Sequence, residues 1–384
     1  MSGCPHGNME VMELNSATSE KIDGIRAEVA ASLAAAEDAL ARLDERVRAS
    51  PIQEGFISRT HFQDACASLW LAGELVLLED LVLHDARMDV RSPTHEVTRA
   101  RAVLRTRRLI ADGAVEWPLS SSGIETLRGD GVEEQSPEEA GGGGGGTSRE
   151  DEAAEQTSAD ALDPLTEELA ELDRALERTS KLLAGAPALP REERTPLIYS
   201  EDWDGGDRLE AWRVAASATR TDPPLLAAAI LWDDWETNPP LERQAWLGNL
   251  LVPAMLRARR KTRSHLLCLN SALRLAPREK RRSRDRSTRL CAFLDAITAG
   301  AEAGMADHDR WLLARRGLET KLKARRSNSR LPALVDFIVA RPVASAGMIA
   351  TELGVTPRAA QDMVAELGLR EMTGRGRYRA WGIF

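Results

Sequence analysis

The chain has 384 residues, of which 43 % are hydrophobic, 4 % aromatic and 29 % charged. This length leaves room for two or three domains, and the small aromatic share with many Ala, Leu, Glu and Arg residues favours helix over sheet. No stretch approaches about 18 consecutive apolar residues. The N-terminus also lacks the basic start and apolar core of a signal sequence, so we expect a cytoplasmic protein with no membrane contact.

The formal net charge of −9 is spread unevenly along the chain. Residues 1–256 hold 24 Lys and Arg against 48 Asp and Glu, residues 257–330 hold 21 against 7, and residues 331–384 hold 6 against 5. The basic block suggests either a surface for a polyanion or an electrostatic contact with the acidic part of the chain. Both interpretations stay open at this stage.

The N-terminal part is predicted to be a helical domain over residues 16–128, after a disordered N-terminus at residues 1–15. In Ser19–Ala49 apolar residues recur every three or four positions, which predicts one long amphipathic helix that Pro51 ends. A similar leucine stripe at residues 162–183 predicts another helix. Such stripes line the seam of a homodimer in some proteins and pack inside one helical bundle in others.

An acidic, glycine-rich stretch at residues 129–160 separates this domain from a second helical domain predicted over residues 161–330. It includes six consecutive glycines at residues 141–146. The stretch cannot bury enough apolar surface to offset its chain entropy, so we expect a disordered tether. It is not a phosphate-binding loop, because no apolar strand precedes the glycines and no Lys-Ser or Lys-Thr pair follows them.

Five tryptophans stand in the second helical domain, and tryptophans can serve as stacking platforms for nucleic-acid bases. Carboxylates flank these rings and would repel a phosphate backbone, so we expect the rings to be core residues instead. The five are Trp203, Trp212, Trp232, Trp235 and Trp246.

The densest group of histidines and carboxylates lies at residues 84–96. Its spacing matches no metal-ligand pattern and arginines interleave it, so we expect a loop between helices with local salt bridges. The four cysteines are far apart and form no CxxC pair. Signature motifs of hydrolases, metalloproteases, P-loop proteins and dinucleotide-binding folds are absent from the sequence. We therefore predict no catalytic residue, no metal, no cofactor and no enzymatic activity. The group comprises His84, Asp85, Asp89, His95 and Glu96.

Three basic runs mark the second helical domain and its junction with the C-terminal segment. They are RARRKTR at 257–263, REKRRSRDR at 278–286 and KLKARRSNSR at 321–330. Lys and Arg at this density neutralise several phosphates of a nucleic acid without regard to sequence. Each run can equally pair with the acidic half of the chain.

The C-terminal segment, residues 331–384, has the local signals of a helix-turn-helix. A first helix opens at Leu331-Pro332, Ser345 is suited to cap a second helix, and Gly354 is suited to the left-handed residue that ends it. Thr356 then caps a third helix that has Pro357 in its first position. In this arrangement the N-terminal end of the third helix meets base edges in the major groove.

Polar residues near the start of this third helix are candidates for reading bases. Arg358 matches O6 and N7 of guanine, and Gln361 matches N6 and N7 of adenine. Asp362 would be repelled by phosphate, so it either accepts a hydrogen bond from cytosine or holds Arg358 in place.

A basic β-hairpin is expected after the third helix, with a turn at Gly374–Gly376 whose glycines permit positive φ. This is the pattern of a wing. Tyr378 either donates to a phosphate or packs beneath the hairpin, and Trp381 closes the small core. The side chains expected along the DNA backbone or in the minor groove are Arg375, Arg377 and Arg379.

The run SRLPALVDFIVARPVASAGMIATELGVTPRAAQDMVAELGLREMTGRGRYRAWGI resembles the C-terminal helix-turn-helix of an uncharacterised bacterial family. In that family a domain of unknown function precedes it, and some members are plasmid-borne. Residues 64–108 resemble the other signature of the family. A more distant similarity is to the Fic proteins, which transfer nucleotidyl groups, because Ser68 and Glu74 in SLWLAGE resemble the helix before their catalytic core. The Fic motif HxFxxGNGR is absent, so no catalytic residue is carried over.

These patterns together predict a mainly α fold: two helical units joined by a disordered acidic tether, followed by a C-terminal winged helix-turn-helix with a small β-hairpin. We expect it to bind double-stranded DNA, as a transcriptional regulator or in a plasmid-related function, and a helical stripe would allow a homodimer. Two alternatives stay open. One is a protein-interaction scaffold or antitoxin-like partner, and the other is a degenerate relative of the Fic nucleotidyltransferases.

Overall fold

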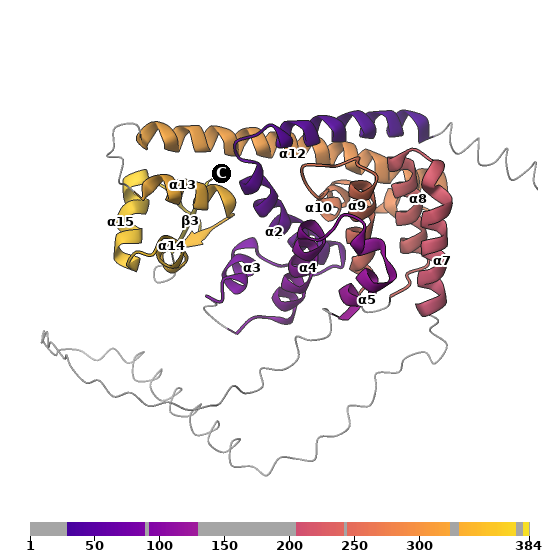
Figure 1. Cartoon of the computed structure of the whole chain (residues 1–384), viewed down its shortest axis with the longest axis horizontal. Helices are drawn as coiled ribbons and strands as arrows, with labels where there is room; N and C mark the ends of the chain where they lie inside the picture. The colour runs from indigo at the N-terminus through magenta and orange to yellow at the C-terminus, as the bar shows by residue number, and fades with distance from the viewer. Residues whose placement is uncertain are drawn as a thin grey trace, which may run out of the picture. The chain divides into compact units, whose positions relative to one another are not determined.

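A computed structural model describes residues 29–88, 92–129, 205–241, 244–322, 330–373 and 379–383. These residues are mainly helical, with one small sheet near the C-terminus (Figure 1), as the sequence predicts. No helix among them is long and apolar enough to cross a lipid bilayer. The predicted disordered N-terminus, the tether, the leucine stripe and Trp203 lie outside the described ranges.

The first helical segment contains the predicted long helix, which the structure describes over residues 29–48. Its apolar stripe is buried in the core, and Val29, Leu40 and Val47 are completely covered. The stripe therefore packs inside the chain itself. The helices that follow are α2 (Gln53–Leu71), α3 (Leu78–Asp85), α4 (His95–Asp112) and α5 (Ser121–Gly129), with a short 3₁₀ turn, η1 (Trp117–Leu119).

The second helical segment ends in a helix of 37 residues, α12, which runs on toward the C-terminal domain (Figure 1). Trp212, Trp232 and Trp235 are buried in this segment, which confirms the prediction that they are core residues. Its helices are α7 (Gly205–Ala218), α8 (Pro224–Thr237), α9 (Gly248–Ala258), α10 (Leu269–Leu275), α11 (Arg278–Arg281) and α12 (Arg286–Leu322), with the 3₁₀ turns η2 (Thr219–Thr221) and η3 (Ala245–Leu247).

The helices of both segments share one core, although the sequence suggests two separate units. Helix α10 packs between α2 and α12, and α2 also packs against α4. A buried arginine joins the segments, since Arg107 pairs with Asp64 of the first segment at 2.9 Å and donates to the carbonyl of Leu267 of the second at 3.0 Å. The composition of a predicted tether bears only on the tether itself, and it carries no information on whether the helices on its two sides meet.

The C-terminal domain consists of three helices and a three-stranded antiparallel sheet with strand order β1-β3-β2. Trp381 in β3 stands opposite Ala344 of β1 and Glu371 of β2. The three helices and the β2–β3 pair follow one another in the predicted order, and β1, which the sequence did not predict, adds a third strand. The elements are α13 (Leu331–Ala340), β1 (Ala344–Ser345), α14 (Ala346–Leu353), α15 (Pro357–Leu367), β2 (Arg370–Glu371) and β3 (Ala380–Gly382).

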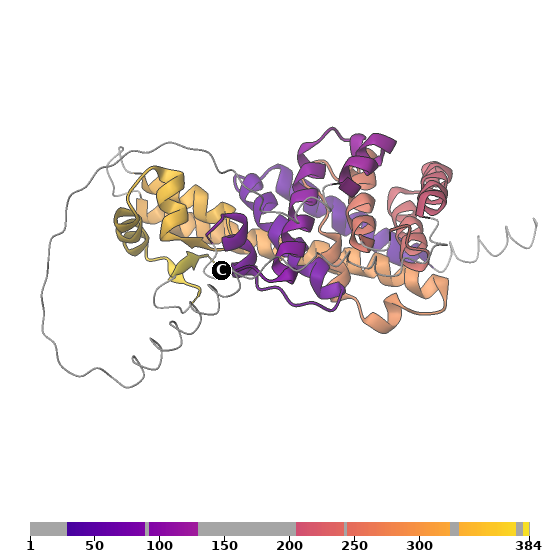
Figure 2. The same ribbon diagram turned by 90° about the horizontal axis from the view of Figure 1, so that it is seen from below.

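Helix α13 packs against α2 and α12 and so attaches this domain to the helical core, as two views at right angles show (Figures 1 and 2). The approach is close, because a Cβ atom placed on Gly55 would lie 2.8 Å from Cγ1 of Val339. An ion pair between Arg315 Nη2 and Asp336 Oδ1 at 2.8 Å supports the same contact.

Candidate nucleic-acid interface

The caps of the two helices of the helix-turn-helix form as the sequence predicts. The hydroxyl of Ser345 accepts from the amide of Met348 at 3.2 Å, and the hydroxyl of Thr356 accepts from the amide of Ala359 at 3.2 Å. Gly354 has φ +60, the left-handed conformation that glycine adopts at low cost. The two hydroxyl bonds satisfy amide groups that a helix start leaves free, so they fix where α14 and α15 begin, and the left-handed Gly354 ends α14.

Helix α15 has one buried and one exposed face. Ala360, Val364 and Leu367 are buried against the rest of the domain, at the helical spacing expected of its inner stripe. Arg358 and Gln361 are exposed on the opposite side, in the first turns of the helix. The structure thus presents both predicted base-reading side chains to solvent on a helix whose position is fixed by its cap and its buried stripe.

The exposed face of α15 has a mixed charge. Nε of Arg358 lies 3.7 Å from Oδ1 of Asp362, and the two side chains are 83 % and 69 % exposed. An ion pair at this exposure contributes little to stability, but it places the carboxylate one helical turn from the guanidinium group. Glu366 is exposed on the same helix. The exposed face of α15 therefore carries one cation, Arg358, and two carboxylates, Asp362 and Glu366.

The β2–β3 pair stands where the sequence predicts a wing. Arg379, predicted to contact the DNA backbone, donates from Nε to Oε2 of Glu371 at 2.6 Å, and its guanidinium lies 5.8 Å from the ring centre of Trp381. Trp381 is buried, which confirms its predicted role in the small core. The other predicted wing residues, Arg375, Arg377 and Tyr378, lie outside the described residues.

Two cations of the third basic run bind helix ends within the protein. Lys321 Nζ donates to the carbonyl of Leu367 at 2.5 Å, and the guanidinium of Arg330 donates to the carbonyl of Leu353. Both carbonyls belong to the last turn of a helix, where the free acceptors and the helix dipole favour a positive charge. The sequence suggested that this run binds phosphates or pairs with the acidic half of the chain, and it did not predict this use.

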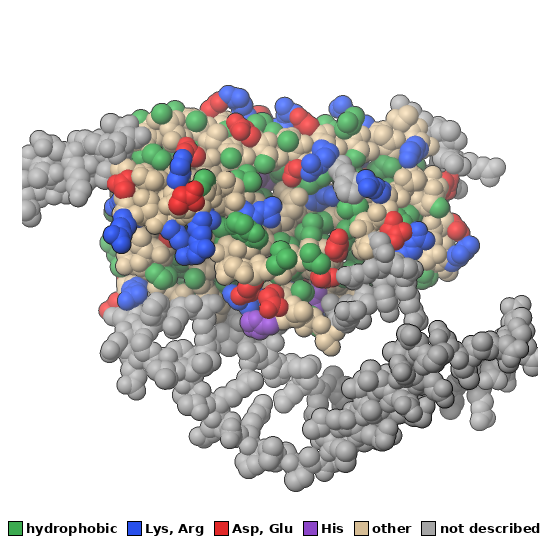
Figure 3. Space-filling model, turned by 180° about the vertical axis from the view of Figure 1, so that it is seen from behind, with side chains coloured by type: hydrophobic (Ala, Val, Ile, Leu, Met, Phe, Trp, Pro, Cys, Tyr) green, Lys and Arg blue, Asp and Glu red, His purple; other side chains and the backbone are tan. Residues whose placement is uncertain are grey.

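The first basic run is also used within the fold. Arg257 donates to the carbonyl of Ile110 at 2.8 Å, Arg259 donates to the carbonyl of Arg220 at 3.0 Å, and Lys261 donates to the carbonyl of Glu37 at 3.1 Å. The sequence left open whether this run binds a polyanion or contacts other parts of the chain. In the structure these three side chains contact other parts of the chain. Basic and acidic side chains are interspersed on the face seen from behind (Figure 3).

The chain has relatives with the same two regions. Residues 331–384 match the family model described as an HTH DNA binding domain, and residues 197–323 match a family described as a protein of unknown function (DUF1612). The chain is also 45 % identical over 356 residues to the uncharacterized protein y4cF of Sinorhizobium fredii (strain NBRC 101917 / NGR234). The aligned region covers 89 % of this chain and 93 % of y4cF. The chain belongs to the same family as y4cF. Within this family the C-terminal domain is a helix-turn-helix DNA-binding domain, which confirms the resemblance seen in the sequence.

The group of histidines and carboxylates near residue 90 forms local contacts in the structure. Both carboxylate oxygens of Asp85 accept from Arg108 at 2.9 Å, and the Thr94 hydroxyl caps α4. Asp89 lies outside the described ranges. Glu74, which resembles a Fic residue, forms an ion pair with Arg99. Among the residues that the structure describes, no three His, Cys, Asp or Glu side chains are grouped as a metal site.

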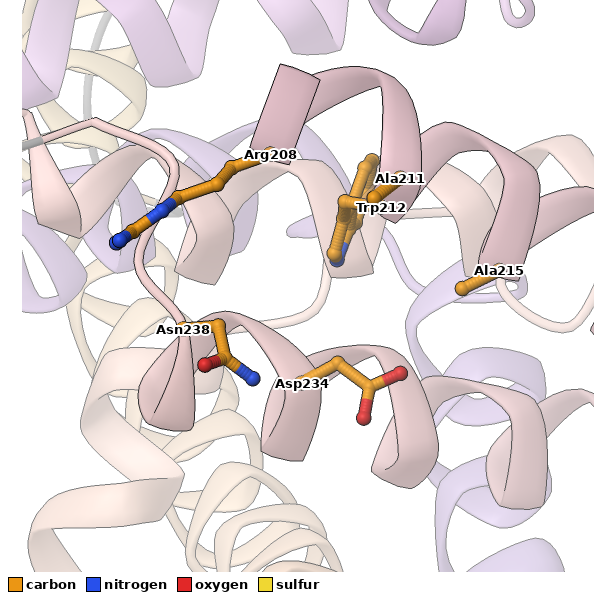
Figure 4. A pocket seen from close by; sticks show the side chains of 6 residues that line it. All are labelled: Arg208, Ala211, Trp212, Ala215, Asp234 and Asn238. Atoms are coloured by element: carbon orange, nitrogen blue, oxygen red, sulfur yellow. The ribbon is translucent and has the colours of Figure 1, made fainter. Parts of the chain in front are cut away.

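A pocket of about 290 Å³ opens between α7 and α8 (Figure 4). Trp212 comes from one helix and Asp234 from the other. Trp212 Nε1 donates to the carbonyl of Leu231 at 3.0 Å, and Oδ1 of Asp234 accepts from Arg286 at 3.0 Å, while burial raises the pKa of Asp234. The arrangement anchors α8 to the start of α12 rather than assembling a catalytic pair. The lining residues are Arg208, Ala211, Trp212, Ala215, Asp234 and Asn238.

Proposed function

We propose that this DUF1612-family protein binds double-stranded DNA in a sequence-specific manner and acts as a transcriptional regulator or in a plasmid-related DNA function. The observation that carries the proposal is the capped helix α15, whose buried stripe leaves Arg358 and Gln361 exposed in its first turns. Arg358 is assigned to guanine and Gln361 to adenine, because their planar groups match the edges of those bases in the major groove.

The hairpin supplies contacts that position the domain. Arg375, Arg377 and Arg379 are assigned to the phosphate backbone or the minor groove, and Tyr378 to a phosphate. Thr356 holds the first turn of α15 in place. A single small domain of this type gives limited affinity, so we further propose that two copies of the chain bind a two-fold symmetric site as a homodimer.

Selection of the full-length chain on randomised duplex DNA tests the proposal. We expect one motif to be enriched by the wild type, and we expect Arg358→Ala to lose the preference at one or two positions, with a cost of about 1–3 kcal/mol per base pair. Arg316→Ala is the control, because Arg316 is an exposed arginine of α12 on the helical core. If no motif is enriched by the wild type, sequence-specific binding is excluded.

A second function is favoured by the carboxylates Asp362 and Glu366 on the exposed face of α15. Such a face suits a basic protein partner, in the manner of a scaffold or antitoxin-like protein. The same selection decides between the two functions. A protein-docking helix predicts that Arg358→Ala leaves DNA binding unchanged, while charge reversal at Asp362 abolishes complex formation with the partner.

A further inference from the structure

The turn between α10 and α12 carries a dense positive charge. Residues 278–284, which we call the basic turn, contain five Lys or Arg residues and one carboxylate, Glu279. Four of the five cations are exposed, and Arg281 is half-buried. The exposed four are Arg278, Lys280, Arg282 and Arg284.

The backbone of the basic turn is held in place by arginines whose charged groups point inward. Nη1 of Arg289 donates to the carbonyl of Ser283 at 2.8 Å, and Nε of Arg281 donates to the carbonyl of Ala276 at 3.2 Å. The carboxylate of Asp285 accepts from the amide of Thr288 at 2.7 Å and so caps the start of α12. These hydrogen bonds therefore hold the backbone that carries the exposed cations in place.

These exposed cations differ from three cations of the first basic run in having few internal partners. In the part of the chain that the structure describes, the side chains of Arg278, Lys280 and Arg284 form no hydrogen bond and no ion pair, and the charge of Arg282 acts at a distance on Glu236 and Arg281. In the first basic run, by contrast, Arg257, Arg259 and Lys261 bond to the protein itself. Like charges that outnumber their counter-charges repel one another, and a polyanion relieves that repulsion.

We propose that the basic turn is a second DNA-contacting surface, which binds the phosphates of duplex DNA without regard to sequence. The inference rests on the proposed DNA-binding function and adds a contact in the DUF1612 region. The turn precedes α12 and the helix-turn-helix domain follows it, and a helix of 37 residues is about 55 Å long. That length corresponds to roughly 16 base pairs at about 3.4 Å each. A short duplex bound by α15 therefore leaves the turn free, and a longer or second duplex occupies it.

The test compares two full-length variants with the same change in charge. In the turn variant, Arg278→Gln, Lys280→Gln, Arg282→Gln and Arg284→Gln are combined. In the control, Arg42→Gln, Arg46→Gln, Arg48→Gln and Arg310→Gln are combined, since these arginines are exposed and each already pairs with a carboxylate. The probe is a duplex of about 40 base pairs without the selected motif, titrated at several salt concentrations.

We expect the turn variant to bind this probe at least tenfold more weakly at low salt and to lower the slope of log affinity against log salt by about two to four units. The control should change the slope by less than about one unit. Equal slopes for the turn variant and the control would overturn the inference. Thermal unfolding of both variants should match the wild type, because the exchanged side chains are exposed.

A second duplex separates this inference from the proposed function. On a duplex of about 12 base pairs that contains one half-site of the selected motif, the turn variant should keep its affinity within about twofold, whereas Arg358→Ala should lose the preference for that half-site. If Arg358→Ala behaves so and the turn variant matches the control on the long probe, the basic turn is excluded and the base-reading function stands. Loss of motif recognition in the turn variant would also contradict a sequence-independent contact.

Discussion

Arg59 on α2 donates a hydrogen bond from Nη2 to the carbonyl oxygen of Ile383 at 3.1 Å, across more than 300 residues of sequence. Its Nη1 also donates to the carbonyls of Ile338 at 3.2 Å and Arg341 at 2.7 Å. The guanidinium lies 4.7 Å from the ring centre of Trp311, and burial lowers the pKa of Arg59 to about 10. One buried side chain of the helical core thus binds three carbonyls of the helix-turn-helix domain, two near the end of α13 and one after β3, and so attaches that domain to the core.

Replacing Arg59 should therefore loosen the attachment of the DNA-binding domain. We expect Arg59→Ala to lower the free energy of unfolding by about 2–4 kcal/mol, because three buried carbonyls lose their donors. Urea unfolding measures the loss. Arg316→Ala, an exposed arginine of α12, should change it by less than about 0.5 kcal/mol. A similarly small effect of Arg59→Ala would show that the three carbonyls find other partners.

The buried histidine beside Arg107 should make stability depend on pH. Nδ1 of His61 accepts from Nε of Arg107 at 3.1 Å, and burial, together with the charges of Arg107 and Arg108, holds the pKa of His61 well below its ordinary value. The unfolded chain binds a proton near pH 6.5 and the folded one does not. The contribution is therefore fully present above about pH 6.5 and is lost as the pH falls, by up to about 1.4 kcal/mol per pH unit.

Unfolding by urea between pH 7 and pH 5 checks this dependence. His61→Gln keeps an acceptor near Arg107 and does not titrate, so its stability should fall less steeply than that of the wild type over this range. His95→Gln removes an exposed histidine and serves as the control. A wild type and a His61→Gln variant with parallel pH profiles would exclude His61 as the source.

Thr356, the N-cap of α15, should matter for both stability and DNA binding. Thr356→Ala removes the acceptor for the amide of Ala359, at an expected cost of about 1 kcal/mol, while Thr356→Ser keeps it. We expect Thr356→Ala to weaken binding to the selected motif, because the first turn of α15 carries Arg358. Thermal unfolding and a DNA titration measure the two effects. If Thr356→Ser binds as weakly as Thr356→Ala, the methyl group and not the cap is responsible.

Local features of the C-terminal domain were predictable from the sequence, whereas the contacts that join it to the core were not. The caps Ser345 and Thr356 and the left-handed Gly354 depend on neighbours within three residues, so their pattern is visible in the chain. Arg59 and Arg107 stand in helices where arginine usually faces solvent, and the carbonyls that link them to distant parts of the chain, those of Ile383 and Leu267, lie 160 or more residues away. A periodic pattern cannot show that such a charge is buried.

In the candidate site, too, local features were predictable from the sequence and long-range contacts were not. The sequence indicated which side chains α15 exposes, because the apolar stripe fixes the opposite face. It did not separate basic residues that bind the protein from those that face solvent. Lys321 and Arg330 cap helix ends, and Arg257 bonds to Ile110, while the turn at residues 278–284 keeps four of its five basic side chains exposed. Charge density along the chain is the same for both uses, and only the fold assigns each cation.

The ion pair between Arg379 and Glu371 in the hairpin should weaken DNA binding. Oε2 of Glu371 accepts from Nε of Arg379 at 2.6 Å, so the charge of this proposed backbone contact is partly neutralised. Glu371→Gln removes the negative charge with little change of shape. We expect it to raise affinity for any duplex at low salt and to steepen the salt dependence by about one unit, because one more phosphate contact becomes available. Titrations at several salt concentrations measure the slope.

The double variant Glu371→Gln/Arg379→Gln is the matched control and should return the slope to the wild-type value or below it. An unchanged slope in Glu371→Gln would mean that Arg379 does not contact DNA, and it would leave the assignment of bases to Arg358 and Gln361 untouched.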